Sequence, residues 1–265
     1  MGEAIVVTSG KGGVGKTTSS ANIGTALALL GKKVCLMDTD IGLRNLDVVM
    51  GLENRIIFDI VDVATGGCRL EQALIKDKRF DHLFLLPAAQ TKDKLALSVD
   101  AARAIVGKLK SQFDYVIIDC PAGIEHGFRV AITGADQAIV VTTPEQAAVR
   151  DADRVIGLLE AEHMPSPKLI INRIKAHMVR NGDMLDIDDI IGILSLDLLG
   201  VVPDDEHVIK AANQGEPTVL RPDSRASIAY RNIARRILGD PVPLMTLQEE
   251  QSGFLSRMKK MIGLR

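Results

Sequence analysis

Residues 10–18 constrain the fold more than any other part of the sequence. They read Gly-Lys-Gly-Gly-Val-Gly-Lys-Thr-Thr, which satisfies the pattern GxxxxGK[ST], and they directly follow an apolar run at 4–8. Glycines let the backbone turn its N–H groups around phosphate oxygens, and the following helix adds its positive N-terminal end. We therefore expect a strand, a phosphate-binding loop and a helix in that order.

Short apolar runs recur along the chain and alternate with stretches long enough for crossover helices. Because most runs are continuously apolar, we expect strands that are covered on both faces, as parallel sheets require. Further strands are expected at 33–37, 83–86, 115–118, 137–142, 168–171 and 198–202, and helices at 16–30, 98–111, 145–162 and 227–238. The predicted fold is α/β: a doubly wound, mostly parallel sheet of the P-loop NTPase type with helices on both faces. Its ligand site should lie beyond the carboxyl ends of the strands.

Composition supports a cytoplasmic globular protein. Of the 265 residues, 46% are hydrophobic and 25% are charged, which supplies a full core. Aromatic residues are 3% and tryptophan is absent, so a protein that stacks single-stranded bases is disfavoured. The three cysteines, Cys35, Cys68 and Cys120, form no CxxC pair, which indicates a reducing compartment. We find no signal-peptide pattern and no apolar stretch that approaches the roughly 18 residues of a membrane span.

Charge is distributed unevenly between the body and the C-terminal end. Residues 253–265 contain four basic residues and no acid; since the net charge is −2, the remainder carries −6. This distribution makes nucleic acid an unlikely partner of the body. We expect three parts: a domain at 1–239 that contains the phosphate-binding loop, a linker at 240–252 that begins with Asp-Pro-Val-Pro, and a basic helix at 253–265.

The C-terminal segment has the pattern of a membrane-surface helix. At 100° per residue, its large apolar residues fall within about 120° and the lysines lie opposite. The apolar residues are Phe254, Leu255, Met258, Met261 and Ile262, and the lysines are Lys259 and Lys260. Such a helix inserts its apolar face among acyl chains and keeps its lysines near anionic headgroups. A helix packed on the domain's own core, or against a partner, would show the same pattern.

Residue types around the loop indicate a magnesium-dependent nucleotide site. Lys16 would contact the β- and γ-phosphates, and the Thr17 hydroxyl would bind Mg²⁺. Asp119 ends the strand at 115–118, where a carboxylate can hold a metal-bound water, while Asp38 and Asp40 close the second strand near the loop. A guanine-reading NKxD motif is absent, which favours ATP over GTP.

The second lysine of the loop, Lys11, makes the segment Lys-Gly-Gly-Val-Gly-Lys-Thr resemble the deviant Walker A family of cell-division and plasmid-partition ATPases. The resemblance implies that Lys11 reaches the phosphates of a second subunit, that Asp40 acts on the attacking water, and that Asp38 holds the metal's water shell. It implies that Cys-Pro-Ala-Gly at 120–123 is a second switch loop, and that Asn172, Pro203 and Asp204 contact adenine. The catalytic residues that the resemblance implies are Lys11, Lys16 and Asp40, and the residues at the metal are Thr17, Asp38 and Asp119. The nucleotide-binding residues that it implies are Gly10, Lys11, Gly12, Gly13, Val14, Gly15, Lys16, Thr17, Thr18, Asn172, Pro203 and Asp204.

Within that family, residues 38–47, Asp-Thr-Asp-Ile-Gly-Leu-Arg-Asn-Leu-Asp, are similar to the septum-site-determining ATPases, and the similarity extends to 141–145 and the C-terminal end. It implies an ATP-dependent homodimer on the inner face of the cell membrane whose hydrolysis a partner stimulates. It also implies a division inhibitor of the MinC type and a regulator, of the MinE type or a polar scaffold, that meet the face around Arg44 and the helix carrying Asp151 and Asp153.

Other functions share parts of this pattern. A DNA-partition ATPase would require a basic patch on the body, and an iron-sulfur carrier would require paired cysteines at an interface. A non-enzymatic membrane adaptor would keep the tail without needing Asp40. A flagellar-number ATPase also ends in an amphipathic helix, and it is the alternative that is hardest to exclude from the sequence.

Overall fold

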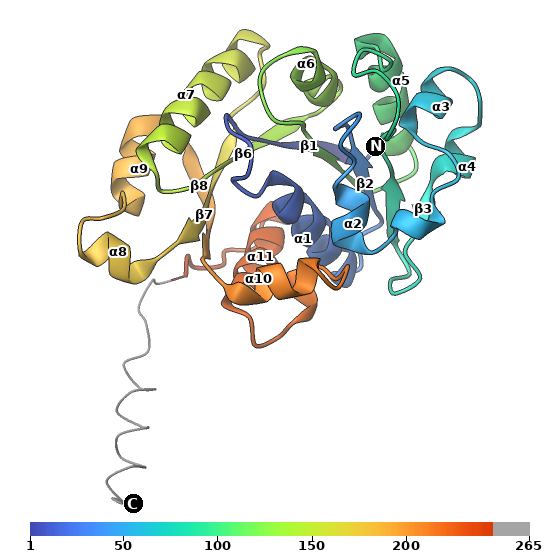
Figure 1. Cartoon of the computed structure of the whole chain (residues 1–265). Helices are drawn as coiled ribbons and strands as arrows, with labels where there is room; N and C mark the ends of the chain where they lie inside the picture. The colour runs from blue at the N-terminus through green and yellow to red at the C-terminus, as the bar shows by residue number, and fades with distance from the viewer. Residues whose placement is uncertain (246–265) are drawn as a thin grey trace, which may run out of the picture.

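The computed structural model describes residues 1–245, and within them one eight-stranded sheet runs in the order β3-β4-β2-β5-β1-β6-β7-β8 (Figure 1). All neighbouring strands pair in parallel except β3 and β4 at one edge. The strands are β1 Glu3–Thr8, β2 Val34–Asp38, β3 Ile75–Lys76, β4 Leu83–Leu86, β5 Tyr115–Asp119, β6 Gln137–Thr142, β7 Lys168–Ile174 and β8 Asp197–Pro203. The predicted α/β fold is confirmed.

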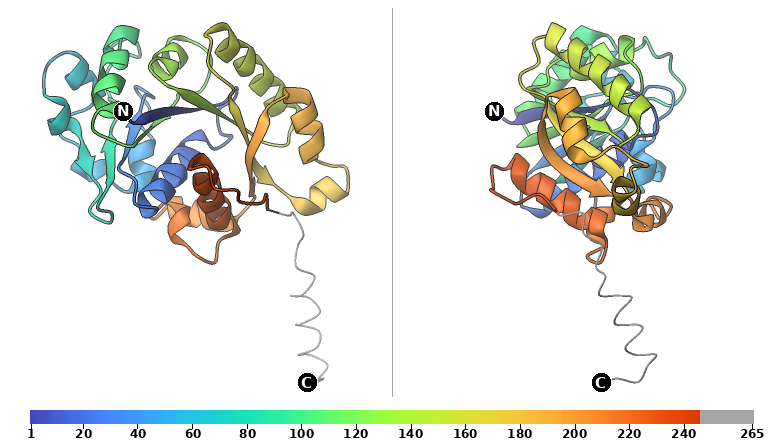
Figure 2. Two further views of the ribbon diagram at one scale, coloured as in Figure 1. Left: turned by 180° about the vertical axis from the view of Figure 1, so that it is seen from behind. Right: turned by 90° about the vertical axis from the view of Figure 1, so that its left-hand side faces the viewer.

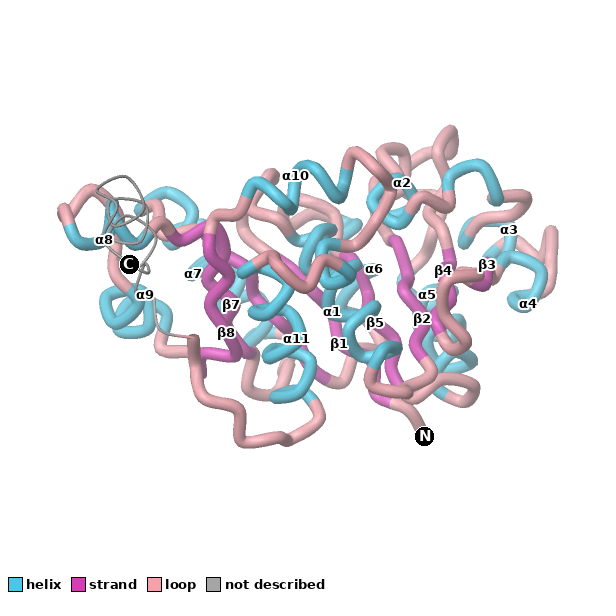
Figure 3. The backbone as a smooth tube through the Cα atoms, turned by 90° about the horizontal axis from the view of Figure 1, so that it is seen from below, coloured by secondary structure: helices cyan, strands magenta, loops and turns pink. Residues whose placement is uncertain are grey.

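Helices cover both faces of the sheet, in two layers that Figure 2 shows from behind and from the side. One layer contains α3 Ile60–Ala64, α4 Leu70–Ala73, α5 Val99–Lys110, α6 His126–Ile132, α7 Gln146–Ala161, α8 Ala176–Arg180 and α9 Ile187–Leu194. The other contains α1 Lys16–Leu29, α2 Leu46–Met50, α10 Glu206–Ala212 and α11 Arg225–Ile237. Seen from below, α1 and α11 lie side by side across the middle of the sheet (Figure 3).

Continuous apolar strands are explained by these two layers. On β1, Ala4 and Val6 belong to the core beneath the first layer, whereas Ile5 and Val7 belong to the core beneath the second. Successive side chains of a strand point to opposite faces, so a strand between two helical layers needs an apolar residue at every position.

Every strand and long helix expected within 1–245 is present, with ends displaced by at most three residues. The short elements were not predicted, because four to eight residues leave too little periodicity to recognise. One of them, α3, is set by local chemistry: Asp59 accepts from the backbone N–H groups of Val61 and Asp62, and the Asp62 carboxylate accepts from the Asp59 N–H in return. Within 1–245, none of the helices has the length and apolar content to cross a membrane.

The chain after α11 stays close to the domain up to the last described residues. Arg236 donates from Nε to the carbonyl of Val242 at 2.9 Å and from Nη2 to the carbonyl of Pro243 at 2.6 Å. The start of the predicted linker is thus tied to α11. The rest of that linker, from 246, and the predicted helix at 253–265 lie outside the described residues.

Candidate functional site

The phosphate loop joins β1 to α1 at the carboxyl edge of the sheet. Close contacts and left-handed backbone conformations explain why glycines occupy this loop. Gly15 has a φ of 101°, and a Cβ at this position would collide with the side-chain amide of Asn172. That amide donates from Nδ2 to the carbonyl of Val14 at 2.8 Å. Asn172, at the end of β7, therefore holds the loop directly. Gly13, with a φ of 80°, also needs the left-handed conformation that glycine adopts freely.

The two lysines of the loop have opposite environments. Lys16 is 7% exposed, and its Nζ donates to the Ser9 hydroxyl at 2.9 Å. Lys11 is exposed; the same Ser9 hydroxyl donates to its backbone carbonyl at 2.8 Å. The ammonium of Lys16 is thus directed into the chain's own site, whereas that of Lys11 is at the surface.

Two carboxylates face each other beside this loop because β2 and β5 are neighbours. Asp38 and Asp119 are register partners, and they are only 1% and 2% exposed. Asp38 accepts from the backbone N–H groups of Asp40 at 2.9 Å and Leu46 at 3.3 Å. Asp119 accepts from the Ser20 hydroxyl on α1 at 2.8 Å.

Burial of this pair makes it a favourable environment for a cation. Desolvation, and then the Asp119 charge, raise the pKa of Asp38 well above its usual range. Burial raises the pKa of Asp119 to about 6, although the hydroxyls of Thr17 and Ser20 and the ammonium of Lys16 oppose the rise. Carboxylate and hydroxyl oxygens are the donors that Mg²⁺ prefers. Across the described part of the chain no group of three or more His, Cys, Asp or Glu could hold a metal ion alone, so water and phosphate oxygens would have to complete the shell.

Asp40 lies at the edge of this cluster and is half-buried. Burial raises its pKa, while the ammonium groups of Lys16 and Lys94 act in the opposite direction. A carboxylate with a raised pKa is a stronger base than one in water. Lys94 belongs to the segment between β4 and α5, which the sequence did not connect with the site.

That segment contacts both loops that flank the carboxylates. The backbone N–H of Gly42 donates to the carbonyl of Ala89 at 2.8 Å, and a ring nitrogen of His126 lies 2.9 Å from the carbonyl of Leu97. The loop at 120–123, expected to be a switch, contains Gly123 with a φ of 97°. Residues 87–98 therefore link the segment after Asp40 to the start of α6.

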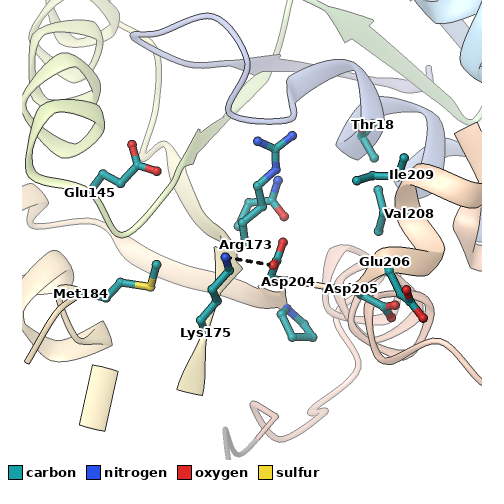
Figure 4. Close-up of a pocket in the computed structure, with 12 residues that line it drawn as sticks. Thr18, Glu145, Arg173, Lys175, Met184, Asp204, Asp205, Glu206, Val208 and Ile209 are labelled. Atoms are coloured by element: carbon teal, nitrogen blue, oxygen red, sulfur yellow. Dashed lines mark ion pairs between the residues drawn. The ribbon is translucent and has the colours of Figure 1, made fainter. Parts of the chain in front are cut away.

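A pocket of about 460 Å³ opens next to the phosphate loop, and it brings together the residues predicted to contact the base. Asn172, Pro203 and Asp204 line it together with Thr18 of α1. Figure 4 shows Thr18 and Ile209 on one side and Lys175, paired with Asp204 at 3.4 Å, on the other. Thr18 therefore connects the phosphate loop to the pocket.

Several lining residues were missed by the sequence reasoning. Arg173 has a φ of 57°, and its guanidinium reaches into the pocket (Figure 4). Val208 and Ile209 come from α10, which was not predicted. A bulky residue in the left-handed region costs free energy and is often found at a binding site, but the sequence carries no signal for that conformation.

The facing carboxylates predict an unusual dependence of stability on pH. A raised pKa means that folding favours protonated Asp119, so its contribution to stability is complete below about pH 4 and is lost as the pH rises through about 6. Asp119→Asn keeps partners for the hydroxyls of Thr17 and Ser20 but carries no charge. We expect its free energy of unfolding to exceed that of the parent by about 3 kcal/mol near pH 8 and to match it near pH 4.

Urea unfolding without nucleotide and with a chelator measures this difference, and Asp183→Asn, at an exposed position, is the matched control. A difference that stays constant across this pH range would show that the Asp119 charge does not oppose folding.

The cysteines do not form the site that an iron-sulfur carrier requires. In residues 1–245, which contain all three, Cys35 and Cys120 are buried in the core and Cys68 is half-buried. The burial of Cys35 and Cys120 fits the expectation that they are small core residues.

Comparison with known proteins identifies the family. A family model described as an AAA domain matches residues 2–164, and one described as a NUBPL iron-transfer P-loop NTPase matches residues 101–238. The chain is 65% identical to the septum site-determining protein MinD of Bacillus subtilis (strain 168), with 100% of both chains covered.

Solved structures of MinD proteins are similar to this chain in fold and in sequence. The MinC:MinD cell division protein complex of Aquifex aeolicus has a TM-score of 0.86 and 49% identity, covering 92% of this chain and 99% of that chain. MinD complexed with Mg-ADP from Pyrococcus horikoshii OT3 has a TM-score of 0.81 and 28% identity, covering 91% and 100%. With each family model matching more than half of the chain and one relative matching all of it, the chain belongs to the MinD family of septum site-determining P-loop ATPases.

Proposed function

We propose that this chain is a Mg²⁺-dependent ATPase switch that dimerises on ATP, docks on the inner face of the cell membrane and recruits a division inhibitor to control septum placement. The observation that carries the proposal is the contrast between buried Lys16 and exposed Lys11 on one phosphate loop. A single subunit can use Lys16 on its own nucleotide. The exposure of Lys11 supports the proposal that it contacts phosphates held by a second copy.

Each residue of the proposed site has a separate role in ATP hydrolysis. Lys16 and the N–H groups of the loop hold the β- and γ-phosphates, and Lys11 of a second copy adds positive charge where negative charge develops. Thr17, Asp38 and Asp119 would hold Mg²⁺, which when bound neutralises charge on the phosphate oxygens. Asp40 orients the attacking water and accepts its proton, as its raised pKa favours.

ATP is the proposed nucleotide, and the amide side chain and the strand end that line the pocket beside the phosphate loop support a contact with its base. Asn172 is 5% exposed, and its Nδ2 is already engaged by Val14, so its position is set before any ligand binds. Pro203 and Asp204 also line the pocket and come from the end of β8, the strand next to β7. These three residues are proposed to contact adenine.

Dimerisation would convert nucleotide state into membrane affinity. A single amphipathic helix of this length is too short to be stable alone in water, and it binds a membrane only weakly. In a dimer the second insertion becomes intramolecular, at an effective concentration in the millimolar range. The protein would therefore be cytoplasmic without ATP and peripheral on the membrane with it.

Partner contacts are proposed on α7 and around Arg44. A Cβ at Gly10 would collide with the backbone of Asp151, so this helix lies directly against the phosphate loop. Arg44, with a φ of 47°, pairs through Nε with the Asp47 carboxylate at 2.9 Å. A division inhibitor of the MinC type and a regulator of the MinE type or a polar scaffold would dock there, and the regulator would stimulate hydrolysis.

Vesicle co-sedimentation tests the membrane switch. The intact chain with ATP and Mg²⁺ is expected to pellet with anionic vesicles at least about tenfold more than with ADP. A chain ending at Met245 should lose this binding. That end point keeps the contacts of Arg236 with Val242 and Pro243, which a chain ending at Gly239 would lose.

A full-length variant with Leu255→Ser and Met258→Ser is the matched control, since it removes apolar area without shortening the chain. Equal pelleting with ADP and ATP would contradict the switch. Retained binding by the shortened chain would assign the membrane contact to another surface.

A further inference from the structure

The outward face of α11 is strongly basic. The helix contains four arginines and no acidic residue. At 100° per residue, Arg225, Ile228, Arg231 and Arg235 fall within an arc of about 120°, and all four are exposed. We refer to these four residues as the α11 stripe; it extends over about 15 Å.

The opposite face of the helix keeps the stripe in place. Ala226, Ala229, Tyr230 and Ile233 are buried against α1 and the sheet, and the Tyr230 hydroxyl lies 3.2 Å from that of Ser19. The helix cannot rotate without exposing this apolar surface, so the arginines are held outward.

The stripe contrasts with the charge of the rest of the body. Residues 221–240 contain five arginines and two aspartates, in a chain whose part before 253 carries −6. Not all of this charge is free. Arg231 donates from Nε and Nη2 to the carbonyl of Val219, and Arg235 pairs with Asp240 at 2.9 Å. The remaining guanidinium N–H groups still present donors and positive charge at the surface.

The described part of the chain ends close to the helix that carries the stripe. Arg236, at the end of α11, holds the carbonyls of Val242 and Pro243, and the described chain ends at 245 on the side of the sheet where α11 lies (Figure 1). Residues 246–265 continue from this point.

We propose that the α11 stripe contacts anionic lipid headgroups when the C-terminal segment is inserted, so that the domain itself adds to membrane affinity. This inference rests on the proposed membrane docking. Guanidinium groups bind phosphate oxygens in a bidentate manner, and exposed Ile228 between them can enter the interface. A lipid surface is favoured over nucleic acid because the described chain ends close to α11, just before the segment proposed to bind the membrane, and because the part of the chain before 253 is acidic.

The test compares two full-length double variants with the same net charge. Arg225→Gln with Arg231→Gln removes two charges from the stripe, whereas Lys108→Gln with Arg154→Gln removes two from exposed positions on α5 and α7, which cover the other face of the sheet. Binding with ATP and Mg²⁺ is measured on phosphatidylcholine vesicles with increasing phosphatidylglycerol. We expect the stripe variant to bind anionic vesicles about tenfold more weakly than the parent, and the control variant less than about twofold.

Further readouts separate the explanations. The deficit of the stripe variant should shrink at high salt and on vesicles poor in phosphatidylglycerol, while its ATPase rate without vesicles and its thermal midpoint match the parent. Equal binding by the stripe variant and the parent, or an equal loss in the control variant, overturns the inference. If the stripe variant loses only binding to duplex DNA that the parent shows, the surface is a nucleic-acid site. A parent that fails to bind vesicles with ATP would instead refute the proposed membrane docking.

Discussion

Replacing Asp40 with alanine is expected to lower the rate of ATP hydrolysis by at least about 100-fold while leaving ATP-driven dimerisation in place. The magnitude is that of losing a positioned general base. Dimerisation should survive because the hydrogen bonds that Asp40 makes within the fold use its backbone, which alanine keeps. Its N–H donates to the Asp38 carboxylate, and its carbonyl accepts from the N–H groups of Leu43 and Arg44. Steady-state phosphate release, with size-exclusion chromatography in ATP, measures the two properties separately.

Two variants sharpen this experiment. Asp40→Asn keeps the shape of the side chain and removes its basicity, so it should be as slow as the alanine variant. Asp223→Ala removes a carboxylate at an exposed position away from the site and should hydrolyse ATP at the parent's rate. Normal turnover by Asp40→Ala would remove this residue from the mechanism.

The two lysines of the loop are expected to fail in different ways. Lys16→Ala should weaken binding of ATP and ADP by at least about 100-fold, because a buried charge directed at the phosphates is lost. Lys11→Ala should bind ADP as the parent does, since the exposed ammonium belongs to the surface. It should nevertheless lose ATP-driven dimerisation and about 1000-fold in hydrolysis, the scale of a charge supplied by a second subunit.

Fluorescent-nucleotide titration and analytical ultracentrifugation distinguish these outcomes. Lys11→Arg is the control that keeps the charge and should retain part of the dimer. A Lys11→Ala protein that still dimerises with ATP would refute the clamp between two subunits. Any nucleotide-dependent docking seen with vesicles would then need an explanation other than a clamp between two subunits.

The layered fold was predictable because its signal is local. Runs such as 34–37 and 115–118 are continuously apolar up to the aspartate that ends each strand, and a strand between two helical layers accommodates that pattern. The short helices could not be predicted, because their local signal is too weak. A helix such as α10, of seven residues, has too little periodicity to be distinguished from a loop.

At the candidate site, residue types were predictable and contacts were not. Lys16, Thr17 and Asp119 follow from a strand-loop-helix pattern and a strand end. Ser9 and Ser20, which bind the ammonium of Lys16 and the carboxylate of Asp119, carry no sequence signal because a serine near a turn is common. Their roles arise from side chains that the fold brings into hydrogen-bond distance.

Local sequence alone determined the conformation of the loop proposed to hold the phosphates, since the glycine pattern sets backbone conformation within a few residues. Tertiary structure decided what surrounds that loop. The strand order places β2 beside β5, so that Asp38 and Asp119 meet, and β7 brings Asn172 against Val14. The physical reason is that backbone conformation depends on neighbours along the chain, whereas strand pairing depends on which apolar faces the whole chain can bury together.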